Sequence, residues 1–125
     1  MGRMRRDSDL IRAILLAVEA DRRCEVLHIP RIEGYGQEAI HFHVLLLTEK
    51  GLLRAALSGQ SLREPWLGVR LTWEGYDFLD HIRDPAVWRA VKKAAGKVGS
   101  WSIETLAAVA KAIVAAQIAE LGLAA

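Results

Sequence analysis

The chain has 125 residues, 52% of them hydrophobic and 26% charged, a composition typical of one globular domain and not of a disordered segment. Its 17 lysines and arginines only just exceed its 15 aspartates and glutamates, so any nucleic-acid site has to be a local patch. The single cysteine, Cys24, excludes an intramolecular disulfide. No apolar leader opens the sequence, and the most apolar stretch, 106–119, is shorter than a membrane span of about 20 residues. We therefore expect a cytoplasmic protein without a membrane segment.

The first third of the chain predicts a helix, a strand and a turn. Asp7 and Ser8 suit an N-cap, and apolar residues then repeat at helical spacing, which predicts a helix from about Ser8 to Asp21. Residues 25–29 are apolar or β-branched and precede Pro30, so they predict a short strand. Gly34-Tyr35-Gly36 predicts a turn.

The middle of the chain predicts a helix followed by a β-hairpin. The helix runs from Gln37 to Lys50 and ends at Gly51, since glycine is common where a helix ends in the left-handed conformation. Residues 52–57 and 68–73 then predict two strands, joined by a loop that contains Gly59 and Pro65.

Three more helices are predicted in the C-terminal half. One opens at Thr72 or Trp73 and continues to about residue 82. Asp84-Pro85 opens the next, and Gly96 and Gly99 are expected to break it. Ser102 caps the last helix, whose apolar face is expected to comprise Ile103, Leu106, Ala110, Ile113, Val114, Gln117 and Leu121.

Two short strings point to a known architecture. Residues 49–53 (EKGLL) resemble the end of a winged-helix recognition helix, and residues 71–75 (LTWEG) resemble the exit from a wing. The chain as a whole resembles the bacterial and phage domain-of-unknown-function family 2513, through residues 6–12, 32–35, 43–47, 51–53 and 71–80. The resemblance covers nearly all of residues 5–121. It implies a winged-helix fold and an origin in mobile elements, but no established activity.

We therefore predict an α+β, mostly helical fold: a winged helix-turn-helix with a small antiparallel hairpin as its wing and extra C-terminal helices. Residues 1–83 form the winged-helix domain with a basic N-terminal arm, and residues 84–125 form a C-terminal helical extension of the same domain, a candidate for dimerisation. The segment between Pro30 and Gln37 is too short for a full helix, so the first member of the helix-turn-helix is degenerate.

The helix at 37–50 has one apolar and one polar face when its residues are projected at 100° each. Ile40, Val44 and Leu47 line the core side, flanked by His43, Ala39 and Leu46. The other side carries Gln37, Glu38, His41, Leu45, Thr48 and Glu49. Gln37 and His41 can read base edges in a major groove, whereas the two glutamates repel phosphates.

Basic residues elsewhere are the predicted contacts to a DNA backbone. Arg3, Arg5 and Arg6 form an arm that suits a minor groove or a row of phosphates. Arg54, Arg63 and Arg70 lie on or beside the wing. The alternative is that these arginines are solvated surface charges paired with neighbours such as Asp7, Asp9 and Glu64.

The leading functional prediction is a transcriptional regulator of phage or mobile-element origin that binds double-stranded DNA. The alternative is a protein-interaction module that keeps the winged-helix scaffold and binds a partner through Glu38, His41, Leu45 and Glu49. The alanine-rich last helix suits close helix packing, so a homodimer through the C-terminal helices is expected.

Enzymatic and metal chemistry have little support in the sequence. No glycine-rich phosphate loop or nucleophile motif is present, so neither an active site nor a cofactor is expected. Cys24, His28, His41 and His43 carry suitable zinc-ligand atoms, but His41 and His43 point apart on one helix, and we expect His43 to be a hydrogen-bonded core residue. The four tryptophans, Trp66, Trp73, Trp88 and Trp101, are expected in the core or an interface rather than as stacking platforms for bases.

Overall fold

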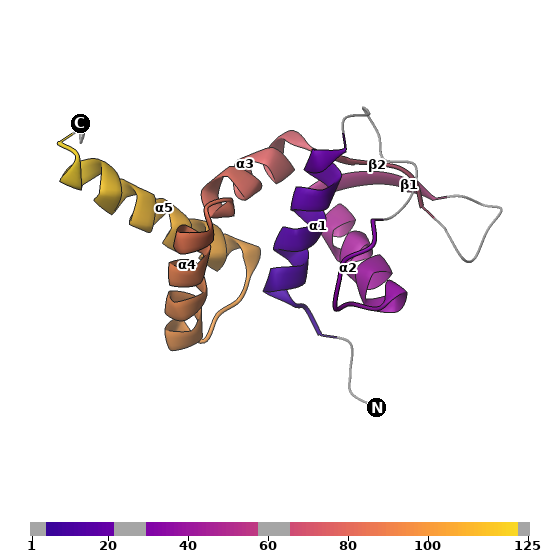
Figure 1. The fold of residues 1–125 in the computed structure, drawn as a ribbon, viewed down its shortest axis with the longest axis horizontal. Helices are drawn as coiled ribbons and strands as arrows, with labels where there is room; N and C mark the ends of the chain where they lie inside the picture. Colours follow the sequence, from indigo (N-terminus) through magenta and orange to yellow (C-terminus); the bar gives the residue numbers. More distant parts are fainter. Residues whose placement is uncertain (1–4, 22–29, 58–65, 123–125) are drawn as a thin grey trace. The chain divides into compact units, whose positions relative to one another are not determined.

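The computed structural model describes residues 5–21, 30–57 and 66–122 (Figure 1). Within these residues the chain is mostly helical, with one antiparallel pair of strands, as predicted. The elements in chain order are α1 (Ser8–Ala20), α2 (Gln37–Lys50), β1 (Leu53–Leu57), β2 (Trp66–Leu71), α3 (Trp73–Ile82), α4 (Pro85–Val98) and α5 (Ile103–Glu120). The predicted strand at 25–29 lies outside the described residues.

The chain divides into two compact units, Met1–Asp77 and Phe78–Ala125, so the boundary falls inside α3. The division predicted from the sequence lies further along, between residues 83 and 84. The first unit contains α1, α2 and the hairpin, and the second contains α4 and α5.

Helix α1 begins where the sequence predicts it. The Asp7 side chain caps the helix by accepting a hydrogen bond from the Leu10 backbone N–H at 3.1 Å. This cap satisfies one of the N–H groups that have no partner inside the first turn of a helix. The buried face of α1 consists of Leu10, Ile11, Ile14, Leu15 and Val18.

Helix α2 ends at Gly51, which has a left-handed backbone with φ 85°. The Leu52 N–H donates to the Leu47 carbonyl oxygen at 2.9 Å, and the Gly51 N–H donates to the Thr48 oxygen at 3.1 Å. These are the two bonds of a Schellman motif, in which glycine avoids the steric penalty of a positive φ. The prediction that Gly51 ends this helix is confirmed.

The two strands of the hairpin pair antiparallel, with Leu53 opposite Leu71 and Arg54 opposite Arg70. The second strand occupies Trp66–Leu71 instead of the predicted 68–73. The prediction placed its end too late because Thr72 serves as the cap of the next helix: its side-chain oxygen accepts a hydrogen bond from the Gly75 N–H and thereby caps α3.

The core of the first unit forms where α1 packs against α2 and β2, and α2 against β1, an arrangement visible in Figure 1. The hairpin and the residue before it contribute the buried side chains of Leu52, Leu53, Val69 and Leu71. Since side chains alternate along a strand, Arg54 and Arg70 lie on the hairpin face opposite to Leu53 and Leu71.

In the second unit α4 packs against α5. Asp84 caps α4 by accepting from the Ala86 and Val87 N–H groups, with Pro85 at the first helical position, as predicted. The predicted break at Gly96 is wrong, because α4 continues through this residue to Val98, and Gly99 ends the helix with φ 79°. A single glycine costs a helix about 1 kcal/mol, which tertiary packing can offset.

Helix α5 starts at the predicted cap, where the Ser102 hydroxyl accepts from the Thr105 N–H at 3.1 Å. Leu106 and Ala110 are fully buried. The apolar face of α5 becomes more exposed towards the C-terminus, where Ile118 and Leu121 are exposed. No described helix is long and apolar enough to cross a membrane.

Candidate nucleic-acid interface

The side of α2 that faces away from the core has the predicted composition. Ile40, His43, Val44 and Leu47 are buried. We call the opposite side the outward face of α2; it comprises Gln37, Glu38, His41, Leu45, Thr48 and Glu49. Gln37, Glu38 and Glu49 are exposed, and Leu45 has 42% of its surface exposed.

His41 differs from its neighbours on this face because it is only partly exposed. Its Nε2 is shielded from solvent and has no hydrogen-bond partner among the described residues. Burying a polar atom without a partner costs free energy. In the conformation described, Gln37 is therefore better placed than His41 to meet an external ligand.

His43 is the hydrogen-bonded core histidine that the sequence predicts. Its Nε2 accepts the Asp7 backbone N–H at 2.8 Å, and its Nδ1 donates to the Ala39 carbonyl oxygen at 2.8 Å. These two partners require a neutral ring with its proton on Nδ1. His43 therefore ties α2 to the residue that caps α1.

Asp7 also receives a hydrogen bond from the Tyr35 hydroxyl, at 3.1 Å. Burial raises the pKa of Tyr35 above its usual value of 10.0, and the hydrogen bond to Asp7 and the charges of Asp7 and Asp9 raise it further. A network of Tyr35, Asp7 and His43 thus joins the turn before α2 and the middle of α2 to the start of α1.

Replacing Tyr35 by phenylalanine is expected to lower the free energy of unfolding by about 1 kcal/mol at neutral pH, the usual contribution of one hydrogen bond. Because folding raises the pKa of Tyr35, its contribution is complete below pH 10 and is lost as the pH rises through the folded-state pKa. Urea denaturation of both proteins at neutral and strongly alkaline pH measures this, with Tyr76→Phe as the control at an exposed tyrosine. A difference that grows with pH would contradict the assignment.

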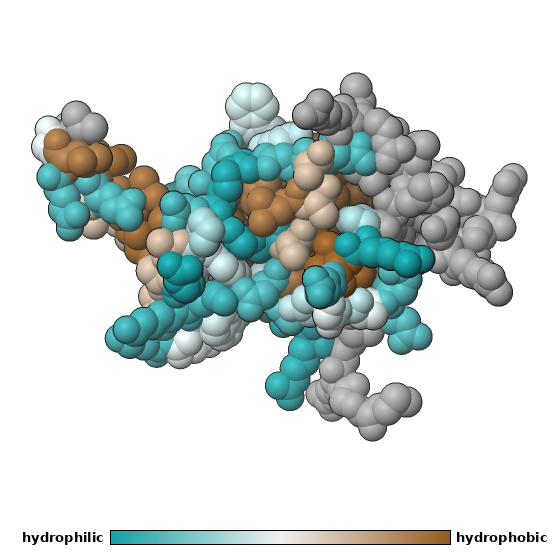
Figure 2. All heavy atoms as spheres, in the orientation of Figure 1, coloured by the Kyte–Doolittle hydropathy of each residue, from teal (hydrophilic) through white to brown (hydrophobic). Residues whose placement is uncertain are grey.

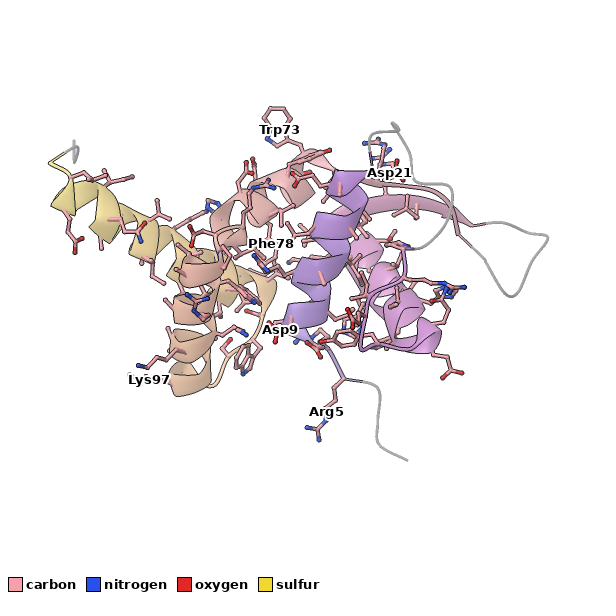
Figure 3. The ribbon with its side chains drawn as sticks, in the orientation of Figure 1. Arg5, Asp9, Asp21, Trp73, Phe78 and Lys97 are labelled. Atoms are coloured by element: carbon pink, nitrogen blue, oxygen red, sulfur yellow. The ribbon has the colours of Figure 1, made fainter. Side chains whose placement is uncertain are left out.

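The N-terminal arm is described from Arg5 onward, and Arg3 lies outside the described residues. Arg5 and Arg6 are exposed, and the structure gives neither one an ion pair with a described residue. In Figure 3, Arg5 points away from the start of α1. The predicted partner Asp7 is instead engaged by Leu10 and Tyr35.

The hairpin brings two of the predicted arginines together. Arg54 and Arg70 are directly opposite each other on adjacent strands, and so project from the same face of the hairpin. Arg70 donates one hydrogen bond to the Leu71 carbonyl oxygen at 3.4 Å, whereas Arg54 has no hydrogen bond or ion pair with a described residue. Arg63, the third predicted arginine of the hairpin, lies outside the described residues.

A compact junction holds the end of α2, the base of the hairpin and the start of α3 together. The Thr72 hydroxyl donates to the Gly51 carbonyl oxygen, and the Thr72 N–H donates to the Leu52 oxygen at 3.1 Å. Gly75 lies against the carbonyl group of Leu52: a Cβ added at Gly75 would be 2.1 Å from the Leu52 oxygen. The two strings that resemble winged-helix sequences, residues 49–53 and 71–75, therefore meet in space.

A groove of about 620 Å³ lies at this junction. The residues that line it include three cationic ones, Lys50, Arg54 and Arg70, one acidic one, Glu74, and one aromatic one, Trp73. We call it the basic groove. Trp73 is 79% exposed, and Figure 3 shows its ring projecting from the start of α3.

The sequence did not predict this grouping of Lys50 and Trp73 with the two arginines. Tryptophans were expected in the core or an interface; Trp88 is buried, but Trp73 and Trp101 are exposed, and the side chain of Trp66 lies outside the described part. A usable signal was the position of Trp73 directly after the Thr72 cap, because the first turn of a helix at the end of a hairpin faces solvent on one side.

No group of three or more histidine, cysteine or acidic side chains in the described parts of the chain is arranged to hold a metal ion. Cys24 and His28 lie outside those parts. His43, the remaining core histidine, has both ring nitrogens in hydrogen bonds to the backbone.

Comparisons with known proteins identify the family. Residues 5–101 match the family described as "Hypothetical protein (DUF2513)". A protein of Haemophilus influenzae, named "Uncharacterized protein", is 34% identical over 119 residues, which cover 93% of this chain and 100% of the relative. No solved structure matches the chain. The matched region includes the junction of α2, the hairpin and α3, and the chain belongs to the DUF2513 family.

Proposed function

We propose that this chain is a winged-helix DNA-binding protein, a transcriptional regulator of the phage or mobile-element kind that acts in the cytoplasm. The observation that carries the proposal is that α2 leads directly into an antiparallel hairpin whose outer face holds the arginine pair Arg54 and Arg70. In winged-helix proteins a helix of this kind enters the major groove. Basic residues beside it neutralise backbone phosphates.

The outward face of α2 supports base reading at its N-terminal end. Gln37 is exposed at the first position of the helix, and N-terminal residues of a recognition helix are those that contact base edges. A glutamine can make two hydrogen bonds to adenine in the major groove. Arg5 and Arg6 provide a second basic segment for the backbone.

The test is binding of the purified protein to a pool of random-sequence duplexes at low and moderate salt, with selection of the bound species. Arg54→Ala and Arg70→Ala are each expected to weaken binding to every sequence and to reduce the salt slope by about 1. Gln37→Ala is expected to relax the selected sequence at one position, a discrimination of about 1–3 kcal/mol. Arg89→Ala, at an exposed arginine of α4, is the matched control. No binding at low salt would contradict the proposal.

The second candidate function is protein binding through the outward face of α2. Leu45, 42% exposed between exposed glutamates, is the observation that favours it, since a partly exposed leucine within a polar rim is a typical anchor of an interface. Leu45→Ala separates the two candidates, because it removes the apolar anchor without adding a charge to the face that would enter the groove. Salt-dependent duplex binding is expected to be nearly unchanged, whereas association with a protein partner is expected to weaken strongly.

A homodimer through the C-terminal helices completes the proposed regulator. Beyond Ala110 the apolar row of α5 becomes exposed, with Ile118 at 40% and Leu121 at 71%, and Figure 2 shows hydrophobic residues along this end of the helix. Ile118→Glu is expected to produce a monomer in light scattering at several protein concentrations. Ala112→Glu, on the opposite side of α5, is expected to leave a dimer intact. A wild-type protein that is monomeric throughout would refute the dimer.

A further inference from the structure

The basic groove is lined by more cationic than acidic residues, and this excess of positive charge does not stabilise the fold. Arg54 and Arg70 are cross-strand neighbours, and like charges directly opposite each other destabilise an antiparallel pair. Lys50 adds a third cation to the lining, and Glu74 is the one acidic residue there. An anion bound in the groove would relieve the repulsion between the arginines.

The geometry of the arginines suits a phosphate group. Each guanidinium carries five N–H donors in a planar fork, and within the described part of the chain Arg70 uses one of them, in its bond to Leu71. Two such groups on one hairpin face can bind different oxygens of the same phosphate.

Trp73 adds an aromatic ring beside the groove, which is not required for binding a simple anion. Trp73 is one of the residues that line the groove, and 79% of its surface is exposed, which leaves a large apolar ring in water beside the groove. Basic grooves combined with exposed aromatic rings are typical of proteins that bind unpaired nucleotides, in which each base stacked on an aromatic ring contributes about 1–3 kcal/mol.

We propose that the basic groove binds a nucleotide, with Lys50, Arg54 and Arg70 on its phosphate and Trp73 stacked on its unpaired base. This goes beyond the proposed duplex binding, because the faces of paired bases are covered by their neighbours and are inaccessible to a tryptophan. The nucleotide comes either from an unpaired segment of a nucleic-acid strand or from a free nucleotide, and both present the same phosphate and base.

The experiment compares three probes on the full chain: a single-stranded oligothymidylate of about ten nucleotides, adenosine triphosphate, and tripolyphosphate, which lacks a base. Fluorescence anisotropy and tryptophan quenching report binding. Trp73→Ala is expected to lower affinity for the oligonucleotide about tenfold, from the lost stacking, and to leave tripolyphosphate binding unchanged. Arg54→Ala and Arg70→Ala are expected to weaken binding of every probe that binds.

Trp101→Ala is the matched control, because Trp101 is also exposed but lies in the other unit. Thermal denaturation verifies that each variant is folded. Binding of both adenosine triphosphate and the oligonucleotide identifies a free-nucleotide site, and binding of the oligonucleotide alone identifies a strand site. Equal effects of Trp73→Ala and Trp101→Ala, or equal affinity for tripolyphosphate and the base-containing probes, would overturn the proposal.

The outcome is separable from that of the duplex proposal. Duplex binding that depends on Arg54 but not on Trp73, together with no single-strand or mononucleotide binding, would retain the regulator and reject the nucleotide site. Single-strand or nucleotide binding that depends on Trp73, with no duplex binding at low salt, would support the nucleotide site and reject the regulator.

Discussion

Gly75→Ala is expected to lower the free energy of unfolding by about 3 kcal/mol or more, within the range for overpacked sites. The added Cβ would be 2.1 Å from the Leu52 carbonyl oxygen and 2.9 Å from Leu71 Cδ2. The Leu52 oxygen is a backbone atom that already accepts the Thr72 N–H, so it cannot move without breaking the junction. The first turn of α3 would have to shift away from the end of α2.

Gly96→Ala is the matched control for this substitution. Gly96 lies inside α4, and its added Cβ would have its nearest contact at 3.7 Å, from Trp101 Cζ2, an ordinary van der Waals distance. Alanine is favoured over glycine within a helix by about 1 kcal/mol, so this variant is expected to be slightly more stable than the wild type. Urea denaturation of the three proteins measures both effects. A Gly75→Ala protein with wild-type stability would mean that α3 does not approach Leu52 as closely as described.

His43→Leu is expected to lower the free energy of unfolding by about 2 kcal/mol. Leucine fills much of the buried volume, but it cannot accept the Asp7 N–H, which then loses its partner at the start of α1. The cost of leaving a buried donor without a partner is typically about 1–3 kcal/mol. The contact between α1 and α2 should weaken first, because Asp7 also caps α1 and accepts a hydrogen bond from Tyr35.

His41→Leu serves as the control on the same helix. Its Nε2 has no partner among the described residues, so the substitution removes no hydrogen bond of that atom. We therefore expect a change of less than about 1 kcal/mol. Thermal denaturation of both variants at neutral pH provides the comparison. A larger loss for His41→Leu than for His43→Leu would reverse the assignment of the two histidines to the core and the outward face.

Several helix ends were predictable from sequence because the interactions that form them are local. Asp84 with Pro85, Ser102 and Gly51 each act on backbone groups within a few residues. The buried line of α2 was predictable for the same reason, since helical periodicity assigns each residue to a face. The predicted break at Gly96 was wrong because glycine disfavours a helix by only about 1 kcal/mol, an amount that tertiary packing can offset.

The composition of the candidate site depended on contacts between distant parts of the chain. Each of the residues Arg54 and Arg70 was identifiable as a basic residue near a hairpin, but the strand register made them direct neighbours. Trp73 has the hydropathy of a core residue, and only its place at the exposed start of α3 makes it a candidate for stacking. Side-chain chemistry thus identified candidates, and tertiary geometry decided which of them lie together.

The sequence by itself determined the helices, the hairpin, the family and the core side of α2, since these follow from capping, periodicity and short strings of residues. Tertiary structure decided why the strings EKGLL and LTWEG occur together: Thr72 binds Gly51 across 21 positions, and Gly75 leaves room for the Leu52 carbonyl. The same approach gathers Lys50, Arg54, Arg70 and Trp73 around one groove. The physical reason is that hydrogen bonds within a turn are set by neighbouring residues, whereas close approach between elements is set by the packing of the whole unit.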